Sequence, residues 1–242
     1  MPSMNTRLLA RVSLACLLGA ATAQAGNPTP GYYLAEGGWG DLEIKPSNGK
    51  ALPFKLLALG PNAHTCDLEG VIQGDRAVLE GEEGKACTVA FSASPGQIRV
   101  APVANEPCRS YCGMRAWFAG TYILPSPKCT PTAKASAQKR FTTLYRSKSY
   151  AQALAELAPI LSECSKTLHW IEEGHIRNDV AVTQYHLGRI DECKTTLAPV
   201  LKDATGDEDS LREALPPTDF DSFLPIAKSA WFNARLCSSG AK

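Results

Sequence analysis

The fold of the second half of this chain is decided by a stretch that occurs twice. Residues 145–161 read YRSKSYAQALAELAPIL, and residues 185–201, forty positions later, read YHLGRIDECKTTLAPVL. Similar segments at a fixed spacing are typical of stacked structural repeats. Stacked helical hairpins are more often binding surfaces than enzymes. This half of the chain therefore indicates a binding partner.

The first 25 residues have the features of a secretory signal peptide. Arg7 and Arg11 give a basic start, a stretch of apolar and small residues follows, and Ala23-Gln-Ala25 is a cleavage site of the A-x-A type. The apolar stretch is too short to span a bilayer. We expect cleavage near Ala25 and a periplasmic or secreted protein, with lipidation at Cys16 as the less favoured alternative.

The charge balance excludes two classes of partner. Removing the signal peptide leaves 23 basic and 24 acidic side chains, with no basic cluster. Such a chain lacks the positive surface that nucleic acids and anionic membranes attract. No later segment is long and apolar enough for a membrane helix. We predict no nucleic-acid partner and no membrane insertion.

Residues 26–124 have the pattern of a disulfide-bonded β domain. Short runs that alternate apolar and polar residues are separated by turn signals such as Ser94-Pro-Gly96. The expected inner strands cover residues 41–44, 52–57, 66–72, 77–80, 87–91 and 97–101. First and last strands at 31–33 and 120–122 would pair and close the sheet. This spacing predicts an antiparallel β sandwich or barrel and does not decide between them.

A Pro-rich linker at 125–132 separates the β domain from a helical domain at 133–242, which makes the chain a two-domain α+β protein. Proline interrupts strands and helices alike. Beyond the linker, apolar residues recur at helical spacing. The expected helices cover residues 133–147, 150–164, 168–187, 190–203 and 221–237. The acidic segment 203–210 is expected to be a solvated loop.

The repeated stretch resembles the tetratricopeptide repeat (TPR). The second copy carries Asn178-Asp-Val-Ala-x3-Tyr-x2-Gly188-x-Ile-x2-Cys193-x3-Leu197, with a small residue and an aromatic in the first helix and Gly at the turn. The first copy departs at Lys148, where Gly is usual, and Cys193 replaces the usual Ala. The resemblance covers residues 134–237 and implies all-α, TPR-like helical hairpins. It implies little about function.

The β domain has a resemblance of its own. The segment Cys108-Arg-Ser-Tyr-Cys112-Gly-x-Arg115-Ala-x-Phe-x-Gly-x-Tyr122 is similar to the Cys-rich β domains of exported proteobacterial proteins. That resemblance implies no activity.

Eight cysteines remain once the signal peptide is removed. An even number in an exported chain is typical of disulfides rather than of a zinc site. The geometry of TPR-like hairpins implies the pairs Cys129–Cys164 and Cys193–Cys237. In the β domain we favour Cys66–Cys87 and Cys108–Cys112, and a crossed arrangement stays open because spacing alone does not settle connectivity.

The chain is poor in catalytic groups. Its four histidines are not spaced like those of an HExxH site, and no G-x-S-x-G elbow, phosphate loop or dinucleotide fingerprint occurs. With all mature cysteines in disulfides, no thiol nucleophile is left. We predict no catalytic residue, no metal site and no cofactor, and conclude that the chain is not an enzyme.

Two surfaces are candidates for binding a partner. The TPR resemblance implies a groove lined by the first helix of each hairpin. The residues that it places there are Gln138, Thr142, Arg146, Asn178, Val182, Tyr185 and His186. Asn178 has a second interpretation, in which it belongs to a buried hydrogen-bond network between helices. The other candidate is a tip of the β domain that combines arginine with aromatics, the residue types enriched at binding hot spots. Its residues are Arg109, Tyr111, Arg115 and Trp117.

These observations favour an exported, non-catalytic protein-binding module with a protein partner in the periplasm. A sharper hypothesis is an inhibitor or immunity protein against a cell-wall-degrading or envelope-targeting toxin. One alternative is an envelope assembly scaffold. The other is a hydrolase with its site on the β domain, which would require a cleft with convergent acids or histidines.

Overall fold

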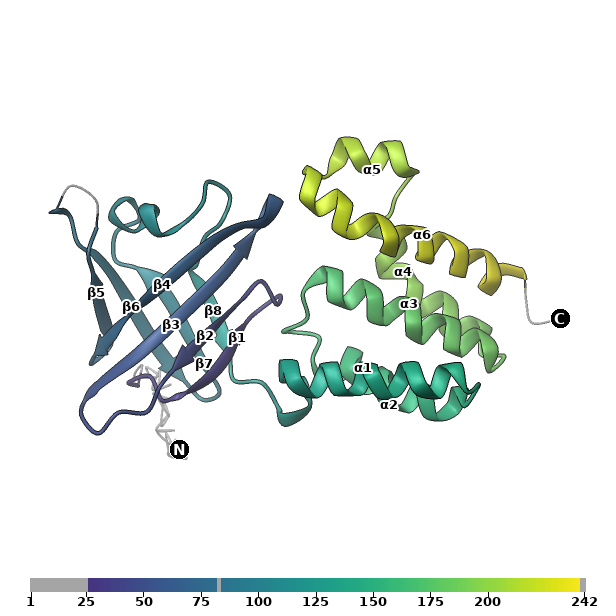
Figure 1. The fold of residues 1–242 in the computed structure, drawn as a ribbon, viewed down its shortest axis with the longest axis horizontal. Helices are drawn as coiled ribbons and strands as arrows, with labels where there is room; N and C mark the ends of the chain where they lie inside the picture. The colour runs from purple at the N-terminus through teal and green to yellow at the C-terminus, as the bar shows by residue number, and fades with distance from the viewer. Residues whose placement is uncertain (1–25, 82–83, 240–242) are drawn as a thin grey trace, which may run out of the picture.

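The structure, a computed structural model, describes residues 26–81 and 84–239. It consists of an N-terminal β-barrel and a C-terminal stack of helices that lie side by side (Figure 1). The predicted signal peptide at 1–25 lies outside the described residues.

The strands form a closed antiparallel barrel in which each strand pairs with its neighbour in sequence. They are β1 (Gly31–Ala35), β2 (Gly40–Ile44), β3 (Ala51–Gly60), β4 (His64–Gln73), β5 (Arg76–Leu79), β6 (Cys87–Ser94), β7 (Gln97–Pro102) and β8 (Gly120–Ile123). The ring closes between the first and last strands, where Leu34 pairs with Ile123 and Ala35 with Tyr122. The predicted closure is therefore confirmed, and the barrel replaces the sandwich alternative.

Alternation along the strands fills the barrel with side chains. On β4, Cys66, Leu68 and Ile72 point inward and are fully buried, while Asp67, Glu69 and Val71 are exposed. The largest fully buried side chains of the barrel are Phe91, Phe118 and Tyr122. A period of two with one buried face is the expected pattern for such a sheet. The interior is a packed core, so function has to be sought on the outside.

The disulfides of the barrel correct the favoured sequence prediction. The structure joins Cys66 to Cys112 and Cys87 to Cys108, not Cys66 to Cys87 or Cys108 to Cys112. The reason is the short 3₁₀ helix η3 (Glu106–Tyr111), which packs against β4 and β6. It places Cys108 against the start of β6 and Cys112 opposite Cys66 on β4. The observed pairs are nested, with Cys87–Cys108 inside Cys66–Cys112, so they differ from the favoured sequential pairs and from a crossed arrangement.

The first helix begins at Pro131, two residues before the predicted start of the helical domain at 133. They are α1 (Pro131–Arg146), α2 (Tyr150–Glu163), α3 (Trp170–His186), α4 (Ile190–Asp203), α5 (Glu208–Ala214) and α6 (Pro217–Ser239). Helix α5 was not expected, because the sequence analysis assigned residues 203–210 to a loop. The acidic residues there start a helix: the Asp207 carboxylate accepts a hydrogen bond from the Ser210 backbone N–H at 2.9 Å. This is N-capping, which favours Asp.

The two copies of the repeated stretch form the same structure. The turns between α1 and α2 and between α3 and α4 place Lys148 and Gly188 in the left-handed region, with φ of 60° and 74°. In both turns this residue donates its N–H to the carbonyl of the tyrosine three positions earlier, Tyr145 or Tyr185, at 2.9 Å. The sequence period of forty is therefore a structural period.

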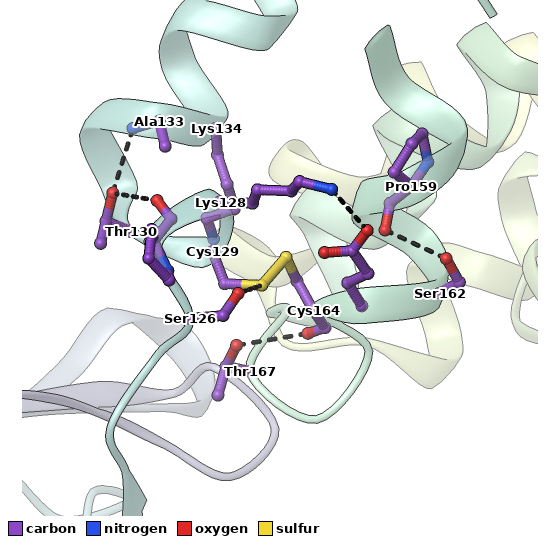
Figure 2. The surroundings of a disulfide bond; sticks show 12 residues. Ser126, Lys128, Cys129, Thr130, Ala133, Lys134, Pro159, Ser162, Cys164 and Thr167 are labelled. Atoms are coloured by element: carbon purple, nitrogen blue, oxygen red, sulfur yellow. Dashed lines mark hydrogen bonds and ion pairs between the residues drawn. A yellow bond between two sulfur atoms is a disulfide. The ribbon is translucent and has the colours of Figure 1, made fainter. Parts of the chain in front are cut away.

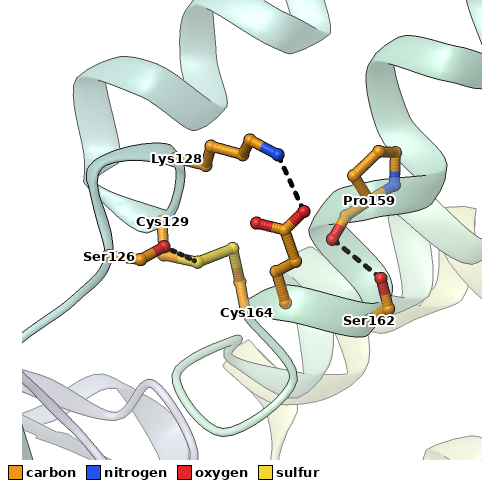
Figure 3. Close-up of polar contacts among 7 residues, drawn as sticks. Ser126, Lys128, Cys129, Pro159, Ser162 and Cys164 are labelled. Atoms are coloured by element: carbon orange, nitrogen blue, oxygen red, sulfur yellow. Dashed lines mark hydrogen bonds and ion pairs between the residues drawn. A yellow bond between two sulfur atoms is a disulfide. The ribbon is translucent and has the colours of Figure 1, made fainter.

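Both disulfides expected in the helical part are present, Cys129–Cys164 and Cys193–Cys237. Figure 2 shows the first of them, which ties the linker to the end of α2. Next to it, the Thr130 hydroxyl caps α1 by accepting a hydrogen bond from the Ala133 N–H at 3.3 Å. The close-up in Figure 3 shows Lys128 beside the same bond, paired with Glu163 at 2.8 Å. These contacts fix where the first helix starts.

The turn geometry predicts that Lys148→Gly stabilises the chain. A residue other than glycine in the left-handed region costs about 1 kcal/mol, and the exposed Lys148 side chain makes no polar contact among the described residues that would offset it. We expect the free energy of unfolding to rise by about 1 kcal/mol in Lys148→Gly and to fall by a similar amount in Gly188→Ala. Denaturant unfolding followed by the helical circular dichroism signal measures both. A destabilised Lys148→Gly variant would contradict this account.

Candidate binding groove

The barrel and the helices are held together at the turn between β1 and β2. Gly37 donates its N–H to the carbonyl of Lys166 at 2.7 Å. The next residue, Gly38, has a φ of +70°, and a Cβ built on it would overlap the backbone of Leu168 and His169. Only glycine fits both requirements. This backbone-to-backbone contact fixes the position of the loop between α2 and α3.

A second barrel turn, between β3 and β4, holds the start of α6. The Asn62 backbone N–H donates to the Asp219 carboxylate at 3.1 Å, and the Asn62 side-chain oxygen accepts from the Thr218 N–H at 3.2 Å. Asn62 has a φ of 60°, a conformation that Asn tolerates better than most residues. Both turns point from the barrel towards the helices in Figure 1. The barrel therefore closes one end of the space between the helices.

A groove lies along α1 and α3, the first helices of the two hairpins. Its half nearer the barrel has a volume of about 750 Å³ and lies between the β1–β2 region, α1, the end of α2 and α3. Its other half, of about 460 Å³, lies between α1, α3 and α6. His175 and Asp179 line both halves, so the two halves are adjacent and share these side chains. We call this surface the groove below.

The floor of the groove is polar. The Lys134 ammonium on α1 pairs with the Glu172 carboxylate on α3 at 2.5 Å, and only 10% of the Lys134 side chain is exposed. One turn further along, the Gln138 amide donates to Asp179 Oδ2 at 2.7 Å. Apolar side chains of Leu157, Ile160 and Ile176 form the wall beside them. The groove thus combines an apolar wall with fixed hydrogen-bonding groups, as ligand sites in proteins do.

Burial changes the titration of two groove residues. It raises the pKa of the Asp179 carboxyl, and the Gln138 hydrogen bond and the charge of His175 offset this only in part. Burial also lowers the pKa of His169, against the opposing effect of Glu172 and Asp219. In both residues desolvation disfavours the charged form, which is the carboxylate of Asp179 and the imidazolium of His169.

Of the groove residues predicted from the sequence, Gln138, Asn178 and Val182 line the groove. Asn178 has a further role, because it is only 6% exposed and its amide donates to the carbonyls of Gly174 and Ile226. The Asn233 amide of α6 in turn donates to Asn178 Oδ1 at 3.0 Å. This is the buried network that the second interpretation described, and it joins α3 to α6.

The other four predicted residues do not line the groove. The Thr142 hydroxyl donates to the Gln138 carbonyl of its own helix, and Arg146 is exposed in the last turn of α1. Tyr185 packs against the core formed by α4 and α6. His186 stacks on Tyr150, with ring centroids 4.4 Å apart, at the turn end of the hairpins. The prediction was wrong for these four residues because projecting the repeat motif onto a helix does not resolve which side of that helix faces the groove.

Most residues of the predicted tip of the β domain form contacts within the domain itself. The Arg109 guanidinium donates to the carbonyls of Ala116 at 2.8 Å, Gly113 and Met114, and lies over the Trp117 ring. The Tyr111 hydroxyl donates to the Glu80 carbonyl. Arg115 is exposed, while Trp117 packs against the barrel core. Arg109 and Trp117 are therefore engaged in holding the loop that leads into β8.

Tyr111 lines a second depression, of about 630 Å³, on the outside of the barrel. It lies where β4 and β5 diverge, because these strands are paired only at Gln73 and Arg76. The residues around it come from both strands, with exposed Val71 and Val78 at its sides and buried Leu79 beneath. It lacks the buried charged groups that distinguish the groove.

Several groove residues were missed by the sequence analysis. They are Lys134, His169, Glu172, His175, Asp179, Lys228 and Phe232. The two on α6 lie outside the repeat, so projecting the motif gave them no position. The sequence does indicate that Asp179 is unusual, because it adjoins Asn178 in a polar cluster. Its hydrogen bond with Gln138, which only the structure shows, places it in the groove.

Comparisons with known proteins give no information about the function of the chain. No family model, no curated protein and no solved structure matches the chain. Within residues 26–81 and 84–239, no cluster of three His, Cys, Asp or Glu side chains is arranged to hold a metal ion. In the same residues no helix has the length and apolar character that a membrane crossing requires.

The docking contact predicts a large difference between two glycine substitutions. Gly38→Ala adds both the strain of a positive φ and an overlap with Leu168 and His169, whereas Gly74, with a φ of +67°, has nothing within 4 Å of a new Cβ. We expect Gly74→Ala to lower the free energy of unfolding by about 1 kcal/mol. Gly38→Ala should lower it further and should also remove the protection of the Gly37 amide in hydrogen exchange. Equal effects of the two substitutions would show that the contact does not hold the barrel to the helices.

Proposed function

We propose that this chain is a non-catalytic protein-binding module that holds an extended segment of a partner protein in the groove. The observation that supports this most directly is the position of the two halves of the groove: they share His175 and Asp179 and follow α1 and α3 from the barrel to α6. An extended chain is long enough to contact both halves at once.

The length of the groove sets the length of the segment. Along α3 it extends from His169 to Val182, which corresponds to about 20 Å at the helical rise of 1.5 Å per residue. An extended chain advances about 3.3 Å per residue, so about six residues fit. The barrel turn at Gly38 limits the groove at one end.

The far end of the groove offers an apolar anchor point. Phe232 on α6 is 54% exposed and lines the groove together with Tyr145 of α1. Exposed aromatic side chains are typical of protein-binding surfaces, where such residues contribute much of the affinity. We propose that an apolar side chain of the partner binds there.

The helical hairpins fit the finer description as TPR-like. Both copies share the left-handed turn residue, and Ala153 and Leu157 of the first copy are as fully buried as Cys193 and Leu197 of the second. In such an arrangement the first helix of each hairpin lines one concave surface. The groove occupies the surface that this description assigns to binding.

The disulfides indicate the compartment in which the protein would bind its partner. The barrel and the helices each contain two disulfides, and such bonds persist in oxidising environments outside the cytoplasm. We propose the periplasm as the compartment, in agreement with the expected signal peptide.

The test compares capture by groove variants and by tip variants. The oxidised mature chain would be immobilised and exposed to a periplasmic extract, beside the variants Phe232→Ala and Met114→Ala. Met114 is 81% exposed on the barrel tip, so its substitution is a matched control for loss of an exposed apolar side chain. We expect a partner that is lost with Phe232→Ala and kept with Met114→Ala.

The opposite pattern would place recognition on the barrel tip and contradict the groove proposal. A cell-wall-degrading enzyme among the proteins that depend on Phe232 would add support for an inhibitor role. Thermal unfolding of both variants, which should match that of the parent chain, shows that neither result comes from misfolding.

A further inference from the structure

The chemistry of the groove also indicates which segment it selects. Asp179 stands at the centre, because it lines both halves, and its carboxyl is partly buried on α3. Its Oδ2 accepts a hydrogen bond from the neutral amide of Gln138. Its position makes it a residue that any segment lying along the full groove must pass.

The other charged side chains of the groove are already paired. Lys134 pairs with Glu172 at 2.5 Å, and Lys228 pairs with Glu208 at 2.8 Å. Asp179 takes part in no ion pair among the described residues. His175 precedes it by one turn and is exposed, and its charge offsets the effect of burial on Asp179 only in part. Asp179 is therefore the uncompensated charge of the groove.

A carboxylate in a partly desolvated site is stabilised by a cation that comes within hydrogen-bonding distance. Lysine and arginine side chains also have long apolar stems that can lie along apolar surface while the charged end reaches a partner. Pro131, Ala135 and Ile171, which are exposed or half-buried, provide such a surface in the half of the groove nearer the barrel. An acidic side chain at this place would meet both Asp179 and Glu172 and be repelled.

From this placement we propose that the groove selects an extended segment with a lysine or arginine side chain, which pairs with Asp179. The inference rests on the proposed function, since it names the residue type that the groove recognises. Asp179 thus becomes the specificity-determining residue of the site, and Gln138 the residue that orients its carboxylate. The apolar end at Phe232 supplies affinity without this selectivity.

A conservative variant separates this role from a structural one. In Asp179→Asn the side-chain oxygen still accepts the Gln138 hydrogen bond, and only the charge is removed. Because burial raises the pKa of Asp179 above that in the unfolded chain, the carboxyl favours folding most at low pH and loses that contribution as the pH rises through the raised pKa. At neutral pH the Asn variant should therefore be at least as stable as the parent chain.

The experiment uses three pools of synthetic hexapeptides with a fixed third residue and random residues elsewhere. The fixed residue is lysine, its uncharged analogue norleucine, or glutamate. Binding to the full oxidised mature chain is measured by fluorescence anisotropy at neutral pH. A desolvated, charge-assisted contact should make the lysine pool bind about tenfold more tightly than the norleucine pool, with the glutamate pool weakest.

The variants decide whether Asp179 causes the preference. Asp179→Asn should remove the difference between the lysine and norleucine pools. Asp191→Asn, which removes an exposed charge from the first turn of α4, is the control and should keep the full preference. A preference for lysine that survives in Asp179→Asn would overturn the assignment.

Two further outcomes separate this inference from the proposed function. Equal binding of the three pools that is lost in Phe232→Ala would overturn the selection of a basic residue and leave the groove as a peptide site. Binding of no pool to the parent chain would overturn both.

Discussion

The close approach of Gly38 to the backbone of Leu168 and His169 is the constraint on which the arrangement of the two halves depends. A backbone contact without side chains allows little adjustment, so it sets the angle at which the barrel meets the helices. It also fixes the loop that precedes α3, and with it Glu172, His175 and Asp179 on the next turns of that helix. The barrel, whose own interior is filled, thus acts on the groove by positioning α3.

The stability of the helical half and its proposed selectivity place opposite demands on α3. Asn178 and Asn233 satisfy each other and the surrounding carbonyls, which makes the α3–α6 contact specific. Asp179, the next residue, is partly buried without a cation. Groups that are poorly compensated in the free protein are common at functional sites, because a ligand can supply the missing partner. One helix therefore carries a residue that stabilises the fold beside one that is stabilised by binding.

The sequence predicted local structure well and long-range geometry poorly. Helix boundaries and most strands followed from periodicity, and the pairing of β1 with β8 followed from the positions of Tyr33 and Tyr122 in the first and last runs. The barrel disulfides were not predictable, because η3 directs Cys108 and Cys112 to different strands. For the groove, the repeat located α1 and α3 but not the faces that they present, so Gln138 was found and Asp179 was missed. Helix α6 completes the groove from outside the repeat, where no register was available.

The order of the cysteines along the chain has a consequence for how the protein matures. In the helical half each cysteine pairs with the next one, so bonds made in the order in which thiols enter an oxidising space are native. In the barrel the pairs are nested, with Cys87–Cys108 inside Cys66–Cys112. Joining thiols there as they arrive would produce non-native bonds that must be exchanged later through thiolate attack. Maturation of the barrel therefore requires either that its strands assemble before oxidation or that an isomerase acts on it, whereas the helices need neither.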